Sequence, residues 1–185
     1  IARGAIPYFA TVALLFRFWY RQYIFFRRYG LNDFRIILLN LGYLALIIFY
    51  IYPLKFLFSL LLSSWTGLDL FPKATEKGLA VLTNEEFPQL IILFSVGYLL
   101  IWLIVYAMYR RALNMTQQIG LNQVETLFTR KECRGALWNA LIGAAALVAA
   151  MLGLPGLAGA CYLLIPVLLI VNQGLFKRQM RRGKS

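Results

Sequence analysis

Uninterrupted apolar segments of helix length constrain this chain more than any other feature. One of them, IILLNLGYLALIIFYIYPL, occupies residues 36–54 without a single charged side chain. An α-helix needs about 20 apolar residues to cross the hydrocarbon core of a bilayer. Hydrophobic residues make up 61% of the sequence, above the roughly 45–50% of soluble domains. The sequence therefore predicts an all-α, multi-span membrane protein and not an outer-membrane barrel, whose segments alternate and are only about ten residues long.

The apolar blocks predict one transmembrane domain over residues 1–185 with five visible spans. We expect helices near residues 5–28, 34–63, 86–109, 133–152 and 156–176. The second block has about 30 residues and would be roughly 40 Å long, more than the roughly 30 Å hydrocarbon core. Pro53 is expected to bend it by removing a backbone donor. The sequence GLPG predicts a tight hairpin between the last two helices.

Local sequences also predict where helices begin. TNEE, with Thr83 and Glu86, and TRKE, with Thr129 and Glu132, fit the capping box, in which a hydroxyl and a carboxylate each bind an unpaired backbone donor. We therefore expect these four residues to cap the third and fourth helices.

The net charge of +12 is concentrated at helix ends, which predicts an orientation. If the five helices alternate, one side receives the cations of the first connection, the third connection and the tail: Arg21, Arg27, Arg28, Arg35, Arg110, Arg111, Arg130, Lys131, Arg134, Lys177, Arg178, Arg181, Arg182 and Lys184. The positive-inside rule makes that side cytoplasmic. We expect a multi-pass protein of the inner (plasma) membrane with a cytoplasmic C-terminus, and an additional N-terminal span would put both termini inside.

The composition argues against catalysis and nucleic-acid binding. The chain has no His, and Cys133 and Cys161 have no metal-site or redox spacing, so we expect no catalytic residues, no metal and no cofactor. The Lys and Arg residues lie at membrane boundaries instead of on a polar face with stacking aromatics, so no nucleic-acid partner is expected.

Arg17 and Arg21 lie one helical turn apart before the first apolar block ends. An arginine near the bilayer centre costs roughly 2.5–3.5 kcal/mol even on lenient scales, so such residues face protein, water or a counter-charge. Either both side chains extend to the interface, or a partner holds them. No acidic residue lies within an apolar block, so we expect a partner from another subunit, from an upstream segment, or from carbonyls and water. Asn40 is expected to form an interhelical hydrogen bond.

Most of the chain resembles the prokaryotic branch of the transmembrane protein 175 family of potassium channels. IPYFATVALLFRFWYRQYIFFRR resembles that family's second span, with Trp19 at its characteristic tryptophan. NDFRIILLNLGYLALIIFYIYPLKFLF resembles the third span, with Asp33, Asn40 and Pro53 matching, and LFSVGYLLIWLIVYAMYRRALN resembles the fourth. The small-residue hairpin and the basic tail are similar to the fifth and sixth spans.

This resemblance implies a subunit of an oligomeric, tetrameric cation channel with potassium as the permeant ion. The family's pore is lined by apolar side chains of a first span with a Phe-Ser-Asp signature, which the 185 residues do not contain. The pore-lining residues, which cannot be named from these residues, are thus expected on an N-terminal helix outside this chain. The resemblance implies an interhelical or gating network of Trp19, Arg21, Gln22, Arg17 and Asn40, in which Gln22 stands where the family typically has His.

A second reading of the sequence is a non-conducting membrane scaffold or accessory subunit. Its basic cytoplasmic face would hold anionic lipid or a partner protein. A secondary transporter is less favoured, because the chain has no repeated halves or paired broken helices.

Overall fold

The computed structural model describes residues 2–66 and 86–182. It leaves out the side chains of residues 2–4, 52, 56–66, 86–88, 155 and 181–182. The described chain is helical and has no strand, which confirms the predicted all-α class. The helices are α1 (Ala2–Tyr29), α2 (Phe34–Thr66), α3 (Glu86–Asn114), α4 (Gln123–Met151), α5 (Pro155–Tyr162) and α6 (Leu164–Arg182).

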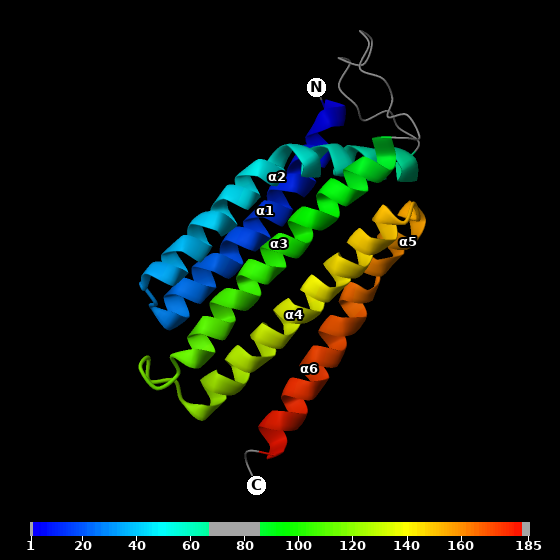
Figure 1. The fold of residues 1–185 in the computed structure, drawn as a ribbon. Helices are drawn as coiled ribbons and strands as arrows, with labels where there is room; N and C mark the ends of the chain where they lie inside the picture. The colour runs from blue at the N-terminus through cyan, green and yellow to red at the C-terminus, as the bar shows by residue number, and fades with distance from the viewer. Residues whose placement is uncertain (1, 67–85, 183–185) are drawn as a thin grey trace.

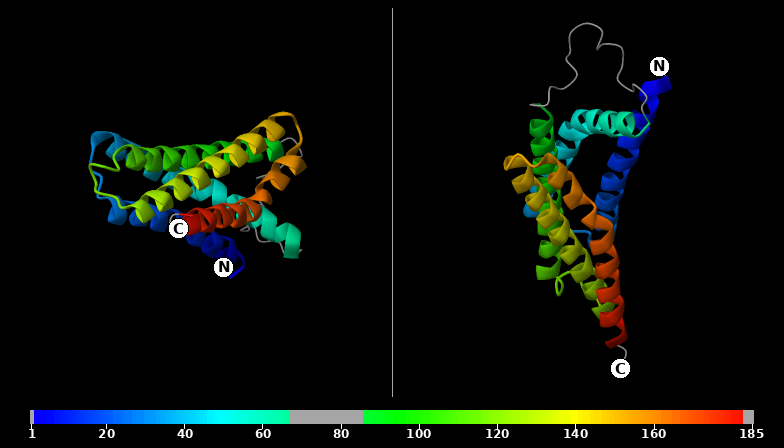
Figure 2. Two further views of the ribbon diagram at one scale, coloured as in Figure 1. Left: turned by 90° about the horizontal axis from the view of Figure 1, so that it is seen from below. Right: turned by 90° about the vertical axis from the view of Figure 1, so that its right-hand side faces the viewer.

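The helices run up and down along a common axis, with α3 between the other elements (Figure 1). Helix α3 packs against α2 on one side and against α4 and α5 on the other, while α1 packs mainly on α2. The α1–α2 and α3–α4 connections and the C-terminus lie at the same end of the bundle, and the N-terminus lies at the opposite end (Figures 1 and 2). The predicted alternation of the helices is therefore confirmed for the described part of the chain.

The first three helices begin close to where the sequence predicts. Helix α1 ends at an αL turn, in which Gly30 has φ +56° and its N–H donates to the carbonyl of Phe26 at 3.0 Å. Helix α2 contains Pro53 and changes direction in its second half (Figure 1), as predicted for a proline that removes an i→i−4 bond. The predicted cap at Thr83 and Glu86 lies outside the described residues or side chains.

Helix α4 begins ten residues earlier than predicted, at Gln123 and not near residue 133. Its cap is Asn122, whose side chain accepts the Glu125 N–H at 2.8 Å, while the Glu125 carboxylate accepts the Asn122 N–H at 2.9 Å. The prediction that Thr129 and Glu132 form a cap was therefore wrong. Both lie inside the helix, because Asn122 and Glu125 form the reciprocal cap closer to the N-terminus.

The last predicted helix is divided into α5 and α6 at Leu163. Pro166 explains the break, because its ring cannot donate to the Tyr162 carbonyl and crowds it. The predicted hairpin at GLPG is present. Gly153, at φ +75°, donates to Ala150 at 3.1 Å, and Leu154 donates to Ala149 at 3.0 Å, the two bonds of a Schellman end.

Four helical segments are long and apolar enough to span a bilayer: Phe34–Ile51, Gln89–Asn114, Gln123–Met151 and Gly156–Met180. Helix α1, whose apolar run is interrupted by Arg17 and Arg21, is not among them. Among the residues that the structure describes, four candidate spans are therefore supported, and the predicted count of five or six is not confirmed.

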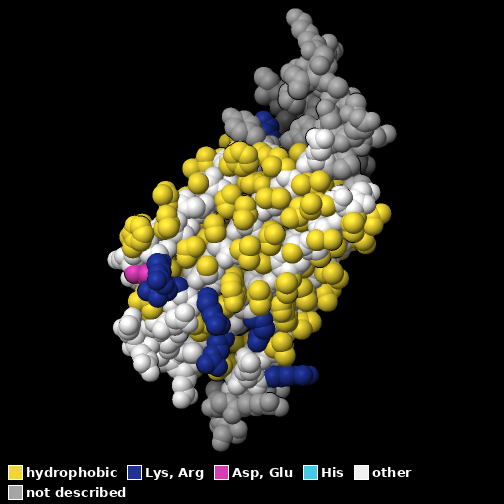
Figure 3. Space-filling model, viewed as in Figure 1, with side chains coloured by type: hydrophobic (Ala, Val, Ile, Leu, Met, Phe, Trp, Pro, Cys, Tyr) yellow, Lys and Arg dark blue, Asp and Glu magenta, His cyan; other side chains and the backbone are white. Residues whose placement is uncertain are grey.

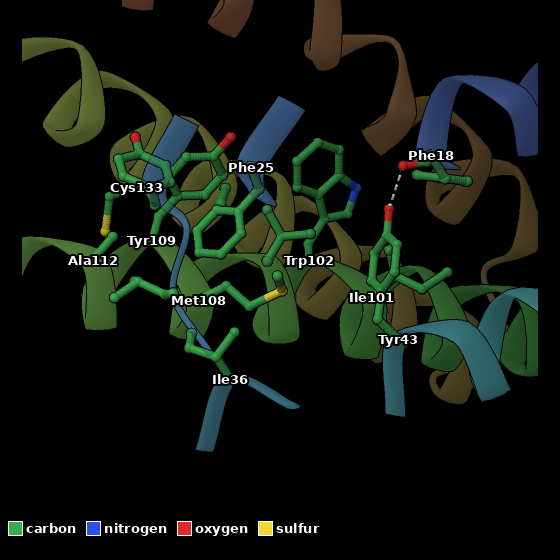
Figure 4. Close-up of a cluster of buried hydrophobic side chains, with 14 of the residues drawn as sticks. Phe18, Phe25, Ile36, Tyr43, Ile101, Trp102, Met108, Tyr109, Ala112 and Cys133 are labelled. Carbon is green, nitrogen blue, oxygen red and sulfur yellow. Dashed lines mark hydrogen bonds between the residues drawn. The ribbon is translucent and has the colours of Figure 1, made fainter. Parts of the chain in front are cut away.

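Aromatic side chains dominate the core between α1, α2 and α3 (Figure 4). Phe25, Tyr43 and Tyr109 are at most 5% exposed, and the Tyr43 hydroxyl donates to the Phe18 carbonyl at 3.0 Å. This bond satisfies a buried hydroxyl and ties α2 to α1.

On the face that Figure 3 shows, the surface is apolar along most of the bundle, and most of the cations gather at one end. That end carries the α3–α4 connection and the C-terminal helix, in agreement with the distribution of Lys and Arg in the sequence. An apolar belt next to a basic rim is the expected surface of a membrane protein near a water interface.

Candidate functional site

Arg21 forms an ion pair with a carboxylate of the same chain. Its Nη2 atom lies 3.5 Å from Oε2 of Glu132, with side-chain exposures of 28% and 16%. This distance is longer than the roughly 2.7–2.9 Å of a charge-assisted hydrogen bond, so the contact is chiefly electrostatic. The expectation that no carboxylate lies at the right depth was wrong. Helix α4 extends far enough beyond the predicted start to place Glu132 beside α1.

Two further groups complete the surroundings of this pair. The Arg21 guanidinium lies 4.9 Å from the centre of the Trp102 ring on α3, a cation–π distance. Lys131 Nζ lies 3.7 Å from Oε1 of Glu132, so that one carboxylate serves two cations. The pair therefore joins α1 to both α3 and α4.

Gln22, the next residue on α1, faces α2. Its Nε2 donates a hydrogen bond to Oδ1 of Asn40. The structure thus brings together two of the residues that the family resemblance implies as a network, and the amide of Gln22 supplies the donor at this position.

A small cavity separates these two contacts. It has a volume of about 10 Å³, and Arg21, Gln22 and Tyr43 are among its lining residues. Nη1 of Arg21 and Oε1 of Gln22 are buried without a hydrogen-bond partner among the described residues. One of these atoms is a donor and the other an acceptor, and both residues line the cavity.

Arg17 and Trp19 do not join the interhelical contacts described above. Arg17 is exposed and lines an open groove with Arg21 and Glu132, and among the described residues it makes no ion pair. Trp19 is 49% exposed, and its ring centre lies 5.6 Å from that of Phe16 and 5.8 Å from that of Tyr23 on the same helix. These residues form an exposed aromatic face of α1.

Sequence reasoning missed a second layer of contacts nearer the basic end. The Tyr29 hydroxyl lies 2.8 Å from Oγ1 of Thr129, joining α1 to α4. Arg111 Nε lies 3.2 Å from Oδ2 of Asp33, joining α3 to the start of α2. The motif NQVE, which forms the true cap, was the signal that could have placed Thr129 within α4.

The arrangement can couple helix positions through charge. One half-buried carboxylate, Glu132, neutralises Arg21, and the Gln22–Asn40 bond links the adjacent position of α1 to α2. A shift of α1 along its axis would break both contacts at once and leave Arg21 without its anion, which is costly in a low-dielectric surrounding.

Comparison with known proteins tests the family resemblance. No family model matches the chain. A protein of Marivirga tractuosa described as a potassium channel is 29% identical over 186 residues, which cover 97% of this chain and 75% of that protein. The crystal structure of a variant of the potassium channel MtTMEM175, bound to a nanobody–MBP fusion protein, matches with a TM-score of 0.80 and 27% identity over 96% of this chain and 79% of that one. The resemblance to the transmembrane protein 175 family is confirmed.

Two statements follow from the matches to these two channels. The chain is a multi-pass membrane protein, because the matched proteins are channels and its helices have the length and composition of spans. Both matched proteins are channels and not enzymes, which confirms the prediction that this chain is not an enzyme.

Proposed function

We propose that this chain is a subunit of an oligomeric potassium-selective channel. The observation that carries the proposal is the match to MtTMEM175, a potassium channel, at a TM-score of 0.80 over 96% of the chain. The relative from Marivirga tractuosa, also described as a potassium channel, supports it over 97% of the chain.

Oligomer formation is supported by the exposed face of α1. Phe9, Phe16 and Tyr20 are 66%, 60% and 50% exposed, although α1 carries two arginines within its apolar run. A neighbouring subunit would cover this face better than lipid, because it could supply polar groups to Arg17. By the family resemblance we propose a homotetramer.

The ion pathway is proposed from the family resemblance. Ions would pass a constriction of bulky apolar side chains on a span with the Phe-Ser-Asp signature. The helices of this chain would surround and position that span. The C-terminus would face the cytoplasm of the plasma membrane, since the basic end carries the α1–α2 and α3–α4 connections and the tail.

The network of Arg21, Gln22 and Asn40 is proposed to hold α1 in register for gating, and Arg17 and Trp19 are proposed to face the neighbouring subunit. Replacement of Arg21 by Ala should alter potassium flux through the full-length protein. Arg17→Ala tests the proposed subunit contact separately and should lower tetramer yield, because Arg17 lies one turn away and makes no ion pair among the described residues. Wild-type flux with normal tetramer yield in Arg21→Ala would refute the gating role.

Flux measurements test the channel itself. The full-length protein is reconstituted into liposomes, and potassium and sodium influx are compared under matched gradients. The proposal predicts a strong preference for potassium. Equal and negligible flux for both ions would remove the channel and leave a non-conducting scaffold.

A further inference from the structure

A basic groove between α3 and α4 is separate from the Arg21–Glu132 pair. It has room for about 800 Å³ and is lined by Arg110, Arg130 and Arg134. Thr116 and Thr126 also line it. Its size lies within the roughly 300–1,000 Å³ of small-molecule sites.

The positive charge of this groove is not neutralised by the described part of the chain. No Asp or Glu is among the lining residues, and neither Arg110 nor Arg130 makes an ion pair within the described ranges. By contrast, Arg21 and Arg111 at the same end of the bundle each have a carboxylate partner. The groove therefore favours an anion supplied from outside the chain.

Arg134 provides an independent indication of a missing acceptor. Its Nε donates to Oδ1 of Asn172 on α6 at 2.9 Å, which fixes the guanidinium. Its Nη2 is buried and has no acceptor among the described residues. A buried charged donor without an acceptor is unfavourable, and the planar guanidinium matches the oxygens of a phosphate.

The exposed face of α4 beyond the groove is apolar. Arg130, Arg134, Leu137, Leu141 and Val148 follow one another at spacings that place them on one side of the helix. The three apolar residues are 37%, 58% and 56% exposed. About 25 Å of helix separates Arg134 from the end of α4, so the arginines lie at one boundary of a roughly 30 Å hydrocarbon core. A molecule with an anionic head and an apolar tail fits this order of side chains.

We propose that the groove binds the phosphate headgroup of an anionic phospholipid, with an acyl chain along Leu137 and Leu141. Basic pockets between transmembrane helices at the water interface bind such headgroups. The site depends only on the helices spanning a bilayer and does not require ion conduction.

The test compares charge-matched variants of the full-length protein. Arg110→Gln/Arg130→Gln removes two charges from the groove and leaves the Arg134–Asn172 bond intact. Lys177→Gln/Arg178→Gln removes two charges from exposed positions of α6 at the same end, outside the groove. Each protein is transferred to nanodiscs of phosphatidylcholine containing a low fraction of phosphatidylglycerol. The phosphatidylglycerol that remains bound after mild detergent extraction is counted by native mass spectrometry.

The groove variant should bind phosphatidylglycerol at least tenfold more weakly than the wild type, because each arginine contributes about 1 kcal/mol to binding of an anionic lipid. The α6 variant should bind it as the wild type does. Equal losses in the two variants would overturn the proposal, since binding would then follow net charge alone.

A second arm separates the lipid from free phosphate. The thermal midpoint of the detergent-solubilised protein is measured with added phosphatidylglycerol, phosphatidylcholine or inorganic phosphate. Phosphatidylglycerol alone should raise it, and the groove variant should lose that rise while retaining the wild-type midpoint without lipid. An equal rise with inorganic phosphate would overturn the assignment to a lipid.

Discussion

The two sides of α3 are packed in different ways. Between α1, α2 and α3 the buried side chains are large, such as Phe25 and Tyr43. Where α4 meets α5 they are almost all alanines, including Ala146, Ala150 and Ala158. In membranes, small residues allow helix backbones to approach closely, whereas polar and aromatic groups bridge wider gaps.

The difference explains where the charges can reside. The aromatic side leaves polar atoms and a cavity of about 10 Å³ between helices, and it contains Arg21 and the Gln22–Asn40 bond. The carboxylate that pairs with Arg21 reaches this side from α4. The buried alanines where α4 meets α5 carry no polar side-chain atoms, so the packing there depends on how closely the helix backbones approach. We therefore expect the aromatic side to respond to changes in charge and hydrogen bonding, and the alanine side to respond to added volume.

The largest effect should come from Gly97→Ala on α3. The added Cβ would lie 1.8 Å from Cζ of Tyr50, which is 4% exposed and donates to the Leu93 carbonyl at 2.7 Å. The ring would have to leave its site, so we expect a loss of about 3 kcal/mol or more in stability. The thermal midpoint of the purified full-length protein measures it.

Gly174→Ala on α6 is the control, because its Cβ would meet nothing within 4 Å. Similar thermal midpoints for the two variants would mean that the aromatic side can be repacked. The proposed difference between the two sides of α3 would then be wrong.

The second effect concerns charge. Glu132→Met should leave Arg21 without its anion and cost about 3 kcal/mol, whereas the double variant Arg21→Met/Glu132→Met should recover most of that loss. A double-mutant cycle on the thermal midpoint isolates the coupling between the two residues. Arg17→Met should show no coupling to Glu132→Met. Additive effects for Arg21 and Glu132 would show that the 3.5 Å contact contributes nothing.

The close contact between α3 and α4, beside the alanine side, is tested by Gly143→Ala. Its Cβ would lie 3.2 Å from both the Cα and the N atom of Leu99, backbone atoms that cannot move independently of α3. We expect α3 and α4 to separate slightly at a cost of about 1–2 kcal/mol. Unfolding midpoints compare this variant with Gly156→Ala, a site with nothing within 4 Å. A cost for Gly143→Ala as small as that for Gly156→Ala would show that this interface has spare volume.

Sequence patterns predicted the helices well where the apolar run and its end signals agree. Gly30 ends α1, and the GLPG turn contains the Schellman glycine Gly153. The predicted start of α4 was wrong because the end of the apolar block was taken as the end of the helix. The helix continues through polar residues once Asn122 and Glu125 cap it.

The same error hid the partner of Arg21. An acidic residue outside the apolar block can still lie beside another helix when both helices extend past the block, as α1 and α4 do. The Gln22–Asn40 bond was accessible to sequence reasoning, because isolated amides within spans seek partners. Bonds such as Tyr98 to Asn139, at 2.7 Å, depend on helix rotation, which apolar blocks alone do not specify.

The smallest effect is expected at the hydrogen bond between Tyr29 and Thr129, where removing the donor and removing the acceptor should have different costs. The Thr129 hydroxyl donates to the Glu125 carbonyl at 2.7 Å, so it accepts from Tyr29, which is 5% exposed. Tyr29→Phe leaves Thr129 satisfied and should cost only about 1 kcal/mol. Thr129→Val leaves the buried tyrosine hydroxyl without an acceptor and should cost more. If Tyr29→Phe instead lowers the thermal midpoint more than Thr129→Val does, the hydroxyl of Tyr29, and not the packing of its ring, holds α1 against α4. The stability of the aromatic side would then come from hydrogen bonding.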